Sequence, residues 1–418
     1  MTVTKIHFHS DLSYFGGCEN MIANFLNSKK MADKYEMTFS FRDSEVYREG
    51  LSARLSTQVK TYPLRFPLFS IYKKTNSESR SRFAKFLDYI RYLIEYLPIV
   101  IVDFIRLQTL FKTISPDILH INNGGYPGAL SCRVSVLAAK FAGVKHIVFV
   151  VNNMAASYGH PYRWIDLPLD KFVAKKVNYF VTGSTIAITR LKKVLNLNEN
   201  QLRSFPNGIS VRETTETLIE TRVRLGLESF QGTIFGIVGV MEPRKGHMHL
   251  LQSLLEIDSK EMPPLIILIE GDGGILPKLK QYVHENNLEN LVHFVGVETQ
   301  IFNFMTLIDA LIYPSIQDED FPNVISEAMS LSKAVISTRV SGATDQIVDG
   351  KTGILVERTS MRQLAEAIVK LASDHALRKS MGEKGRSRYL NNYTSELTLD
   401  NYLALYESML ENGEINVK

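Results

Sequence analysis

Residues 309–329 read DALIYPSIQDEDFPNVISEAM, and this stretch has the form of one strand, one loop and one helix of a parallel sheet. The apolar run 310–313 has strand length, and Pro322 suits the first turn of a helix, where its missing N–H costs nothing. We therefore place Glu319 in the loop at the carboxyl end of the strand and Glu327 on the helix. On a single helix the two glutamates would lie about 12 Å apart, too far for a paired acid and base. We expect the two carboxylates to have different roles.

The start of that helix is a candidate anion-binding site. Free backbone N–H groups and the positive end of the helix dipole near Phe321, Asn323 and Val324 would face whatever lies in front of the sheet. In an open α/β sheet, ligands bind at that edge. Two glutamates at this spacing are weak evidence alone, but their position after an apolar strand and Tyr-Pro-Ser makes the pattern much more specific.

The rest of the chain repeats this alternation in two cycles, and its 418 residues are enough for two domains of about 200 each. The turn Pro206-Asn207-Gly208 separates the cycles. We predict an α/β protein of two doubly wound domains, 1–207 and 208–393, with a C-terminal helix in 394–418 that packs back towards the first domain. The strand candidates are 5–9, 118–121, 146–151 and 179–182 in the first cycle, and 233–239, 265–270, 291–295, 310–313 and 334–337 in the second.

The two halves of the chain differ in charge. Residues 1–205 hold 28 Lys and Arg against 15 Asp and Glu, whereas the remainder holds 20 against 29. We therefore expect the halves to meet different partners. The basic half has no aromatic-interleaved basic motif and no recognition-helix pattern, which argues against nucleic acid. An anionic membrane surface is the favoured partner.

The cysteines and the first residues indicate the compartment. Cys18 and Cys132 cannot form a disulfide framework and fit a reducing environment. The start MTVTKIHFHSD lacks the apolar core of a signal peptide, and no window approaches 18 consecutive apolar residues. We expect a cytoplasmic protein, peripheral on the membrane at most.

One segment, 54–112, stands apart because it has 11 basic and 4 acidic side chains. Within it, apolar residues recur at helical spacing and form one stripe. The stripe either faces the core, with the basic side solvated, or docks on anionic membrane. The sequence leaves both alternatives open, with the core-facing one slightly favoured. The stripe consists of Phe83, Phe86, Leu87, Ile90, Leu93, Ile94 and Leu97.

A second group of candidate ligand-binding residues lies in 236–246, GIVGVMEPRKG. A strand ends at Gly239, and Arg244 and Lys245 then lead into a helix over about 247–255. Adjacent cations at a strand-to-helix turn suit a diphosphate, although a solvated Arg-Lys pair is the simpler alternative. The run IEGDGG at 269–274 ends another strand. Taken alone, it predicts only a tight turn.

Together these motifs resemble the large retaining glycosyltransferase family of GT-B fold that is often called family 4. The rear half has EPRKG at 242–246, GDG at 271–273, HFVG at 293–296 and then Glu319 through Glu327, in the order and spacing of that family. The front half is similar more weakly. It has FGGCE at 15–19, PDILH at 116–120 and PNG at 206–208.

The resemblance implies a GT-B architecture, in which two Rossmann-like domains flank a cleft, and a metal-independent, retaining hexosyltransferase. A nucleotide sugar would be the donor, with a UDP-sugar favoured over a GDP-sugar, and no cofactor or metal would be needed. The acceptor would be a sugar or a lipid-linked hydroxyl, as in surface polysaccharide or glycolipid assembly. Which sugar, base and acceptor are used, and the oligomeric state, stay open.

The resemblance also implies roles for single residues. Lys245, assisted by Arg244, would hold the donor diphosphate, and Glu327 would bind the ribose hydroxyls. Glu319 would lie beside the donor sugar, with Phe321, Asn323 and Val324 nearby and Val297 next to the base. The phosphates would approach the glycine turns at Gly16, Gly17, Gly239 and Gly271.

Two departures from the family pattern bear on activity. The family usually has an arginine where this chain has Val240, so one phosphate cation is missing. It also commonly has a histidine where Asn152 and Asn153 stand, and asparagine cannot carry a positive charge. His120, Asn152 and Asn153 are the acceptor-side candidates, although a lone histidine is more often structural. These departures keep open the alternative of a sugar-nucleotide-binding partner subunit with little catalysis of its own.

Overall fold

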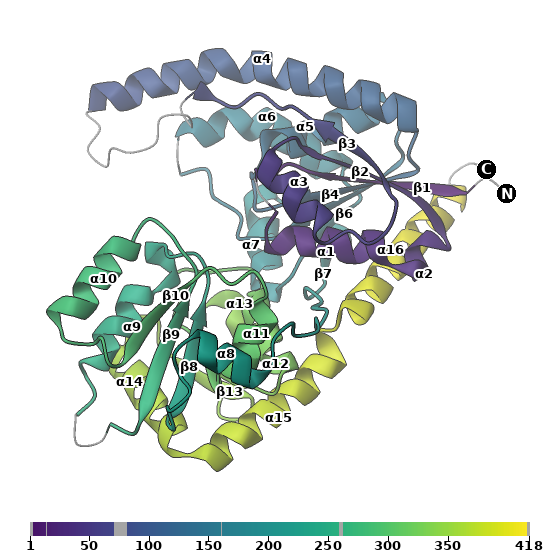
Figure 1. Ribbon diagram of the computed structural model, residues 1–418. Coiled ribbons are helices and arrows are strands. Elements are labelled where there is room, and N and C mark those ends of the chain that lie inside the picture. The colour runs from purple at the N-terminus through teal and green to yellow at the C-terminus, as the bar shows by residue number, and fades with distance from the viewer. Residues whose placement is uncertain (1–2, 14, 71–81, 160, 259–261, 416–418) are drawn as a thin grey trace. The chain divides into compact units, whose positions relative to one another are not determined.

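The computed structural model describes residues 3–13, 15–70, 82–159, 161–258 and 262–415 (Figure 1). The chain forms two compact units, Met1–Phe205 with Thr398–Lys418 and Pro206–Leu397. The division after Phe205 lies two residues before the boundary that the sequence predicts. The two units are described one at a time below, as the front unit and the rear unit.

The front unit is built on a seven-stranded sheet in the order β3-β2-β1-β4-β5-β6-β7, and every neighbouring pair is parallel. The order reverses between β1 and β4, as in a doubly wound sheet. The strands are β1 Thr4–Ser10, β2 Tyr35–Arg42, β3 Lys60–Leu64, β4 Ile118–Asn123, β5 His146–Val151, β6 Tyr179–Thr182 and β7 Leu202–Ser204. The helices are α1 Gly17–Asn27, α2 Lys29–Ala32, α3 Glu45–Ser52, α4 Arg82–Ile114, α5 Leu130–Phe141, α6 Pro161–Lys176 and α7 Thr185–Leu195. Short 3-10 turns complete the connections.

The four strands predicted in this unit are present, and β2, β3 and β7 were missed. β2 is buried, yet it contains the polar residues Thr38 and Ser40. Their hydroxyls lie 2.8 Å from ring nitrogens of His7 and His9 on β1, so both polar groups are satisfied inside the core. A strand stabilised by such cross-strand hydrogen bonds lacks the apolar run by which the other strands were recognised.

The rear unit is built on a six-stranded parallel sheet in the order β10-β9-β8-β11-β12-β13. Its order reverses between β8 and β11, which is the switch point where ligands bind in such sheets. The strands are β8 Thr233–Val238, β9 Leu265–Glu270, β10 Val292–Gly296, β11 Ala310–Tyr313, β12 Ala334–Thr338 and β13 Gly353–Val356. The helices are α8 Leu218–Arg224, α9 His247–Leu254, α10 Leu276–Glu285, α11 Ile301–Leu307, α12 Asn323–Ser330, α13 Ser341–Gln346, α14 Met361–Ser373 and α15 His375–Asn392.

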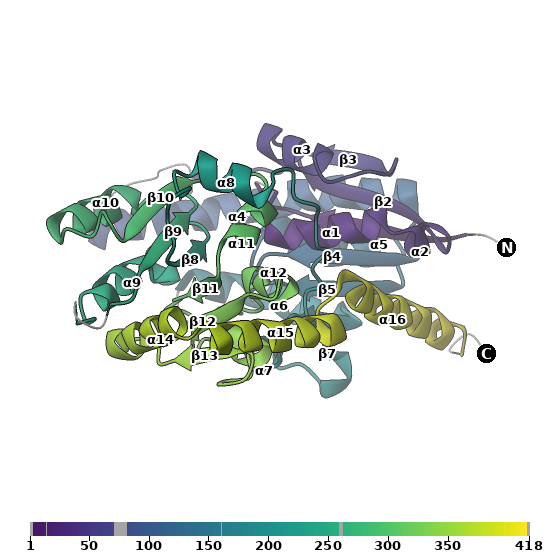
Figure 2. The same cartoon turned by 60° about the horizontal axis from the view of Figure 1, so that its bottom comes forward.

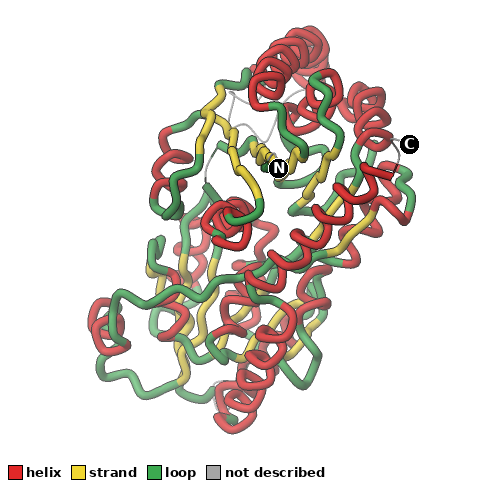
Figure 3. Tube along the Cα trace, turned by 90° about the vertical axis from the view of Figure 1, so that its right-hand side faces the viewer, coloured by secondary structure: helices red, strands yellow, loops and turns green. Residues whose placement is uncertain are grey.

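In each unit the strands lie between layers of helices, as the tube view shows (Figure 3). In the rear unit, α14 and α15 pack against β12 and β13 (Figure 2). The five strands predicted here are present, and only the short β13 was missed. Two doubly wound α/β units are therefore confirmed.

The last helix, α16 (Ser395–Ile415), completes the core of the front unit. Tyr402 and Tyr406 are buried against the apolar residues of β1 and α1. The hydroxyl of Tyr406 lies 2.6 Å from Nδ1 of His120 on β4, so the C-terminal segment closes over the early strands of the sheet.

The apolar stripe of α4 faces outward, which corrects the slightly favoured expectation that it faces the core. The side chains of Ile94 and Leu97 are 69% and 62% exposed, and all six stripe residues from Phe86 to Leu97 are exposed. The opposite face of α4 packs inward through Tyr92, Ile99, Leu107 and other residues, so the helix has two apolar faces and the sequence pattern could not tell them apart. The side chain of Phe83 is outside the described part. In the part of the chain that the structure describes, every helix is too short or too polar to traverse a bilayer.

Candidate functional site

The Arg-Lys turn of the rear unit is held against the end of β11. Arg244 and Lys245 lie on a short 3-10 turn that ends at Gly246 with φ +73°. A Cβ at Gly246 would lie 1.8 Å from the carbonyl oxygen of Pro314, so only glycine fits there. The Ile316 N–H donates to the Arg244 carbonyl at 2.9 Å. The loops after β8 and β11 are therefore packed against each other and hydrogen-bonded at the switch point of the sheet.

Glu319 brings the two cations together. Its carboxylate lies 2.8 Å from Arg244 Nη1 and 2.7 Å from Lys245 Nζ. The ammonium of Lys245 also lies 5.5 Å from the centre of the Tyr313 ring. Burial opposes charging of Arg244, but Glu319 and Glu242 outweigh it and raise the pKa of the guanidinium. Arg244 therefore stays charged, and Glu319 fixes both side chains in position before any ligand arrives.

The loop that carries Glu319 is fixed by the segment after β12. The Gly342 N–H donates to the Glu319 carbonyl at 3.0 Å, and a Cβ at Gly342 would lie 1.9 Å from the Asp320 carbonyl oxygen. Asp318 accepts from the Ser341 N–H and pairs with Arg358, and these hydrogen bonds hold its pKa below the usual value despite partial burial. As predicted, Glu319 is in the loop after the strand and Glu327 is on the helix.

The helix α12 begins at Asn323, with Pro322 as its N-cap residue rather than inside the first turn. Phe321 is buried, while Asn323 and Val324 are half-buried. The Oδ1 of Asn323 accepts a hydrogen bond from Asn207 at 3.2 Å. The helix start thus lies beside the loop of Glu319, as the sequence predicts.

Glu270, at the end of β9, is a candidate that the sequence interpretation missed. Its side chain is 6% exposed, and burial together with the charges of Glu298 and Glu327 raises its pKa to about 7. The Glu298 N–H donates to its carboxylate at 3.0 Å. The available signal was a lone acid at the end of the apolar run LIILIE. The charges of Glu270 and Glu327 therefore interact within the same unit as the Arg-Lys turn.

The glycine turns after β8 and β9 pack closely on one another. Gly239 has φ +141° and Gly271 has φ +117°, and a Cβ at Gly271 would lie 2.3 Å from the Gly239 carbonyl oxygen. Val240 is 51% exposed, and Val297, which follows β10, is 67% exposed. Nothing therefore blocks a larger side chain at position 240.

The front-unit candidates differ in accessibility. Gly16 and Gly17 form the start of α1. His120 is buried, and burial lowers its pKa to about 3, so it packs and hydrogen-bonds as a neutral ring. Asn152 donates to Asn122 Oδ1 at 2.7 Å, and Asn153 caps the next N–H. The acceptor-side role of these residues stays a prediction.

Comparison with known proteins agrees with this geometry. Residues 228–388, which include the Arg-Lys turn and α12, match the family described as Glycosyl transferases group 1. The chain is 31% identical over 258 residues to the capsular polysaccharide biosynthesis glycosyltransferase CapM of Staphylococcus aureus, covering 58% of this chain and 66% of CapM. It is 34% identical to the uncharacterized glycosyltransferase MJ1178 of Methanocaldococcus jannaschii, but over only 36% of this chain and 42% of that protein. The matches thus span less than two thirds of these relatives.

Similarity to solved structures extends over the whole chain. The structure of Anabaena Alr3699/HepE in complex with UDP superposes with a TM-score of 0.76 at 16% identity, covering 97% of this chain and all of that one. A glycosyltransferase from Rickettsia africae superposes with a TM-score of 0.77 at 18% identity, covering 99% of this chain and all of that one. At this identity the likeness establishes the fold, which is GT-B. The chain is thus similar to a glycosyltransferase family over residues 228–388, and it has the GT-B fold over nearly its whole length.

Proposed function

We propose that the protein is a retaining glycosyltransferase that moves a sugar from a nucleotide sugar to an acceptor hydroxyl in surface polysaccharide or glycolipid assembly. The observation that carries this proposal is the pair of cations, Arg244 and Lys245, fixed by Glu319 at the switch point of the rear sheet. Positive charge placed before the reaction stabilises a departing diphosphate without reorganisation. The capsular polysaccharide relative supports the biological class.

In the proposed reaction, Lys245 and the start of α12 stabilise the diphosphate as the bond from the sugar to its phosphate oxygen breaks. The acceptor hydroxyl attacks from the same face, and an oxygen of the leaving phosphate takes its proton. Glu319 then orients the cations and lies beside the sugar, while Glu327 accepts hydrogen bonds from the ribose. No carboxylate attacks the sugar, in contrast to a retaining hydrolase.

The proposed donor is a UDP-sugar rather than a GDP-sugar, since structures of the similar HepE were solved with UDP and with UDP-glucose. We propose that no metal takes part. Asp318 and Asp320 form the Asp-x-Asp pattern within this loop, but Asp318 is engaged by Arg358. Turnover that persists in EDTA would agree with this proposal, and restoration of turnover by Mg²⁺ would contradict it.

We also propose that the protein works at the cytoplasmic face of a membrane, attached through α4. The outward apolar face of this helix continues from Phe86 through Ile101 to Ile105, over about five turns. The surrounding segment 54–112 carries a net positive charge. An apolar helix face flanked by basic residues suits an anionic lipid surface and a lipid-linked acceptor.

Two measurements test the proposed function. UDP should raise the melting temperature of the protein more than GDP does, because ligands that bind the folded state stabilise it. Incubation with UDP-glucose and related donors should release UDP slowly, and the released or transferred sugar should keep its anomeric configuration in an NMR time course. Inversion of the anomeric centre would refute the retaining mechanism.

The alternative is a sugar-nucleotide-binding subunit with little catalysis of its own, and Val240 and Asn152 are the features that favour it. The relatives named as glycosyltransferases do not favour it. UDP binding without release of UDP from any sugar nucleotide in the panel would decide for this alternative. Glu327→Ala should in that case still weaken UDP binding, since the ribose contact does not depend on turnover.

A further inference from the structure

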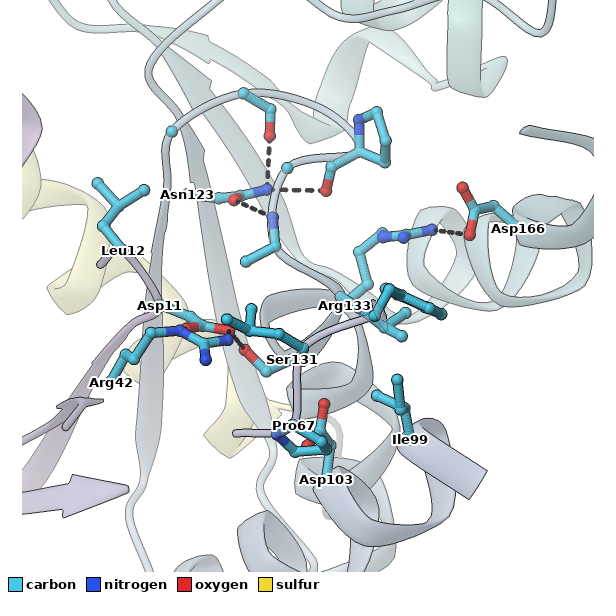
Figure 4. Close-up of a pocket in the computed structure, with 18 of the residues that line it drawn as sticks. Asp11, Leu12, Arg42, Pro67, Ile99, Asp103, Asn123, Ser131, Arg133 and Asp166 are labelled. Atoms are coloured by element: carbon cyan, nitrogen blue, oxygen red, sulfur yellow. Dashed lines mark hydrogen bonds and ion pairs between the residues drawn. The ribbon is translucent and has the colours of Figure 1, made fainter. Parts of the chain in front are cut away.

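The front unit contains two pockets that differ in how their cations are paired. The larger one, of about 760 Å³, lies at the carboxyl edge of the sheet, and Asp103 of α4 is on its wall (Figure 4). Its arginines are paired with aspartates of the same wall. Arg42 lies 3.0 Å from Asp11, and Arg133 lies 2.8 Å from Asp166. The positive charge of this pocket is therefore neutralised within its own wall.

The smaller pocket, of about 480 Å³, lies between α6 and α7 and contains cations that are not paired. Lys171 and Lys175 of α6 line it one helical turn apart, and both are exposed. Neither has an ion-pair partner among the residues that the structure describes. The acid of the lining, Asp170, is already bound by Arg133 at 3.1 Å and Arg163 at 3.0 Å. Two like charges at this spacing repel each other, and no side chain of the described wall neutralises them.

The rest of the lining combines amide groups with apolar side chains. The Nε2 of Gln201 donates to the carbonyl oxygens of Ala174 and Val177, both at 3.0 Å, and this holds the segment after α7 against the end of α6. Asn196, which ends α7 with φ +53°, and Asn198 add exposed amides. The apolar part of the lining consists of Leu167, Ala174, Val194 and Leu195. An apolar lining with a few polar groups is typical of sites for small organic ligands.

Positive charge continues beyond the smaller pocket. Lys176 follows Lys175 at the end of α6. Lys140, at the end of α5, donates to the carbonyl oxygens of Val144 and Lys145 at 3.2 and 2.7 Å. Burial, and secondarily the charge of Lys176, lowers the pKa of Lys140 to about 8. No carboxylate of the described residues offsets this lowering, so this end of the front unit has a positive potential that attracts anions.

We propose that the pocket between α6 and α7 is a second anion-binding site, which binds an organic phosphate ester through Lys171 and Lys175. Two ammonium groups match the charge of a phosphomonoester, which is close to −2 at neutral pH, and such an anion relieves the repulsion between the lysines. The amides of Asn196 and Asn198 can donate to its oxygens, and the apolar lining can contact its organic part. Every lining residue belongs to the front unit, so the proposal does not depend on the proposed transferase function.

A simpler role for these lysines is to stabilise α6, because cations near the end of a helix interact favourably with its dipole. Lys175 lies in the last turn of α6. This role needs no ligand. It predicts a lower melting temperature when the lysines are replaced, and no saturable binding of a phosphate ester by the wild type.

The test is a calorimetric titration of the full chain with glucose 1-phosphate. We expect saturable binding, which Lys171→Gln combined with Lys175→Gln weakens about tenfold or more, because two charge-assisted contacts are lost. Lys29→Gln combined with Lys193→Gln is the matched control, since it removes two exposed lysines of the same unit outside the pocket and should change binding about twofold or less. No saturable binding by the wild type, or equal losses in the two double variants, would overturn the proposal.

Two further measurements identify the source of the phosphate and separate this site from the Arg-Lys turn. Displacement of glucose 1-phosphate by vesicles that contain phosphatidic acid, but not by pure phosphatidylcholine vesicles, would assign the site to a lipid head group. Binding that persists in both would assign it to a soluble ester, and either result supports the site. Lys245→Ala should leave the binding of glucose 1-phosphate unchanged. If Lys245→Ala abolishes that binding and the variant with Lys171→Gln and Lys175→Gln retains it, the ester binds in the rear unit and the proposal is refuted.

Discussion

The two units have the same edge of the same kind of sheet, and the cations there are paired with carboxylates in both, but the pair in the rear unit is more exposed. In the rear unit, Arg244 and Lys245 share the carboxylate of Glu319 and lie on a turn fixed by Gly246. In the front unit, Arg42, Arg133 and Arg163 are each paired with aspartates inside the pocket wall. Arg244, whose side chain is 34% exposed although it also pairs with Glu242, can still reach an anion, whereas Arg133, at 3%, is enclosed by its carboxylates. The fold provides the edge in both units, and the exposure of the paired charges differs between them.

The largest expected effect comes from removing a cation of the rear unit. Lys245→Ala should lower donor turnover by about a hundredfold to a thousandfold, because a preorganised charge on the leaving group is lost. Steady-state release of UDP measures this. Arg362→Ala, which removes an exposed cation of the same unit, is the matched control and should change turnover little. Equal turnover by Lys245→Ala and the wild type would show that the charge of Lys245 does not stabilise the leaving diphosphate.

The pH dependence of stability compares the acids of the two edges. Glu270 in the rear unit and Asp103 in the front unit both have a pKa of about 7, above the ordinary values of 4.5 and 3.8. The folded state thus holds these protons more tightly than the unfolded state, so the stabilisation is complete below about pH 4 and is lost as the pH rises to about 7. For Glu270 this amounts to about 3 kcal/mol.

Urea unfolding measured between about pH 5 and about pH 8 should therefore show falling stability of the wild type, and Glu270→Gln should flatten this slope for the rear unit. Glu366→Gln, at an exposed acid of the same unit that pairs with an arginine, serves as the control and should leave the slope as it is. A steeper decline in Glu270→Gln would contradict the raised pKa.

The outward face of α4 gives the next prediction. Ile94→Asp combined with Leu97→Asp should reduce co-sedimentation with phosphatidylglycerol-containing vesicles about tenfold, since two exposed apolar side chains become acidic. Ile219→Asp, at an exposed isoleucine of the rear unit, is the control. Wild-type binding should also weaken as salt rises. Undiminished binding in the double variant would exclude this face as the attachment surface.

The smallest expected effect is a gain in affinity for UDP. Val240→Arg restores a cation after β8, and the exposure of Val240 leaves space for it. We expect about threefold to tenfold tighter UDP binding, as one added charge-assisted contact in a partly screened site allows. Calorimetric titration measures this, with Val223→Arg as a control at another exposed valine. Weaker binding would show that the diphosphate does not approach this turn.

Much of the fold could be predicted from the sequence, because parallel strands that are buried on both faces appear as apolar runs. β9 and β11 were predicted with their observed bounds, and Glu319 and Glu327 fell in the predicted loop and helix. β2 escaped because its Thr38 and Ser40 are satisfied by histidines of β1, a partnership that lies across the sheet and not along the chain. Glu270 was missed as a site residue for a related reason, because its raised pKa depends on burial and on the charges of Glu298 and Glu327.

By itself, the sequence determined the two α/β cycles, the division near residue 206 and the Arg-Lys turn, because periodicity, turn chemistry and spacing are properties of neighbouring residues. Only the tertiary structure decided which face of α4 is buried, that the front-unit arginines are neutralised, and that one carboxylate oxygen of Asp103 has no hydrogen-bond partner among the described residues. Those facts depend on contacts between residues far apart in the chain, such as Arg42 with Asp11 and Arg133 with Asp166. Burial and charge pairing are set by neighbours in space, so no pattern along the chain records them.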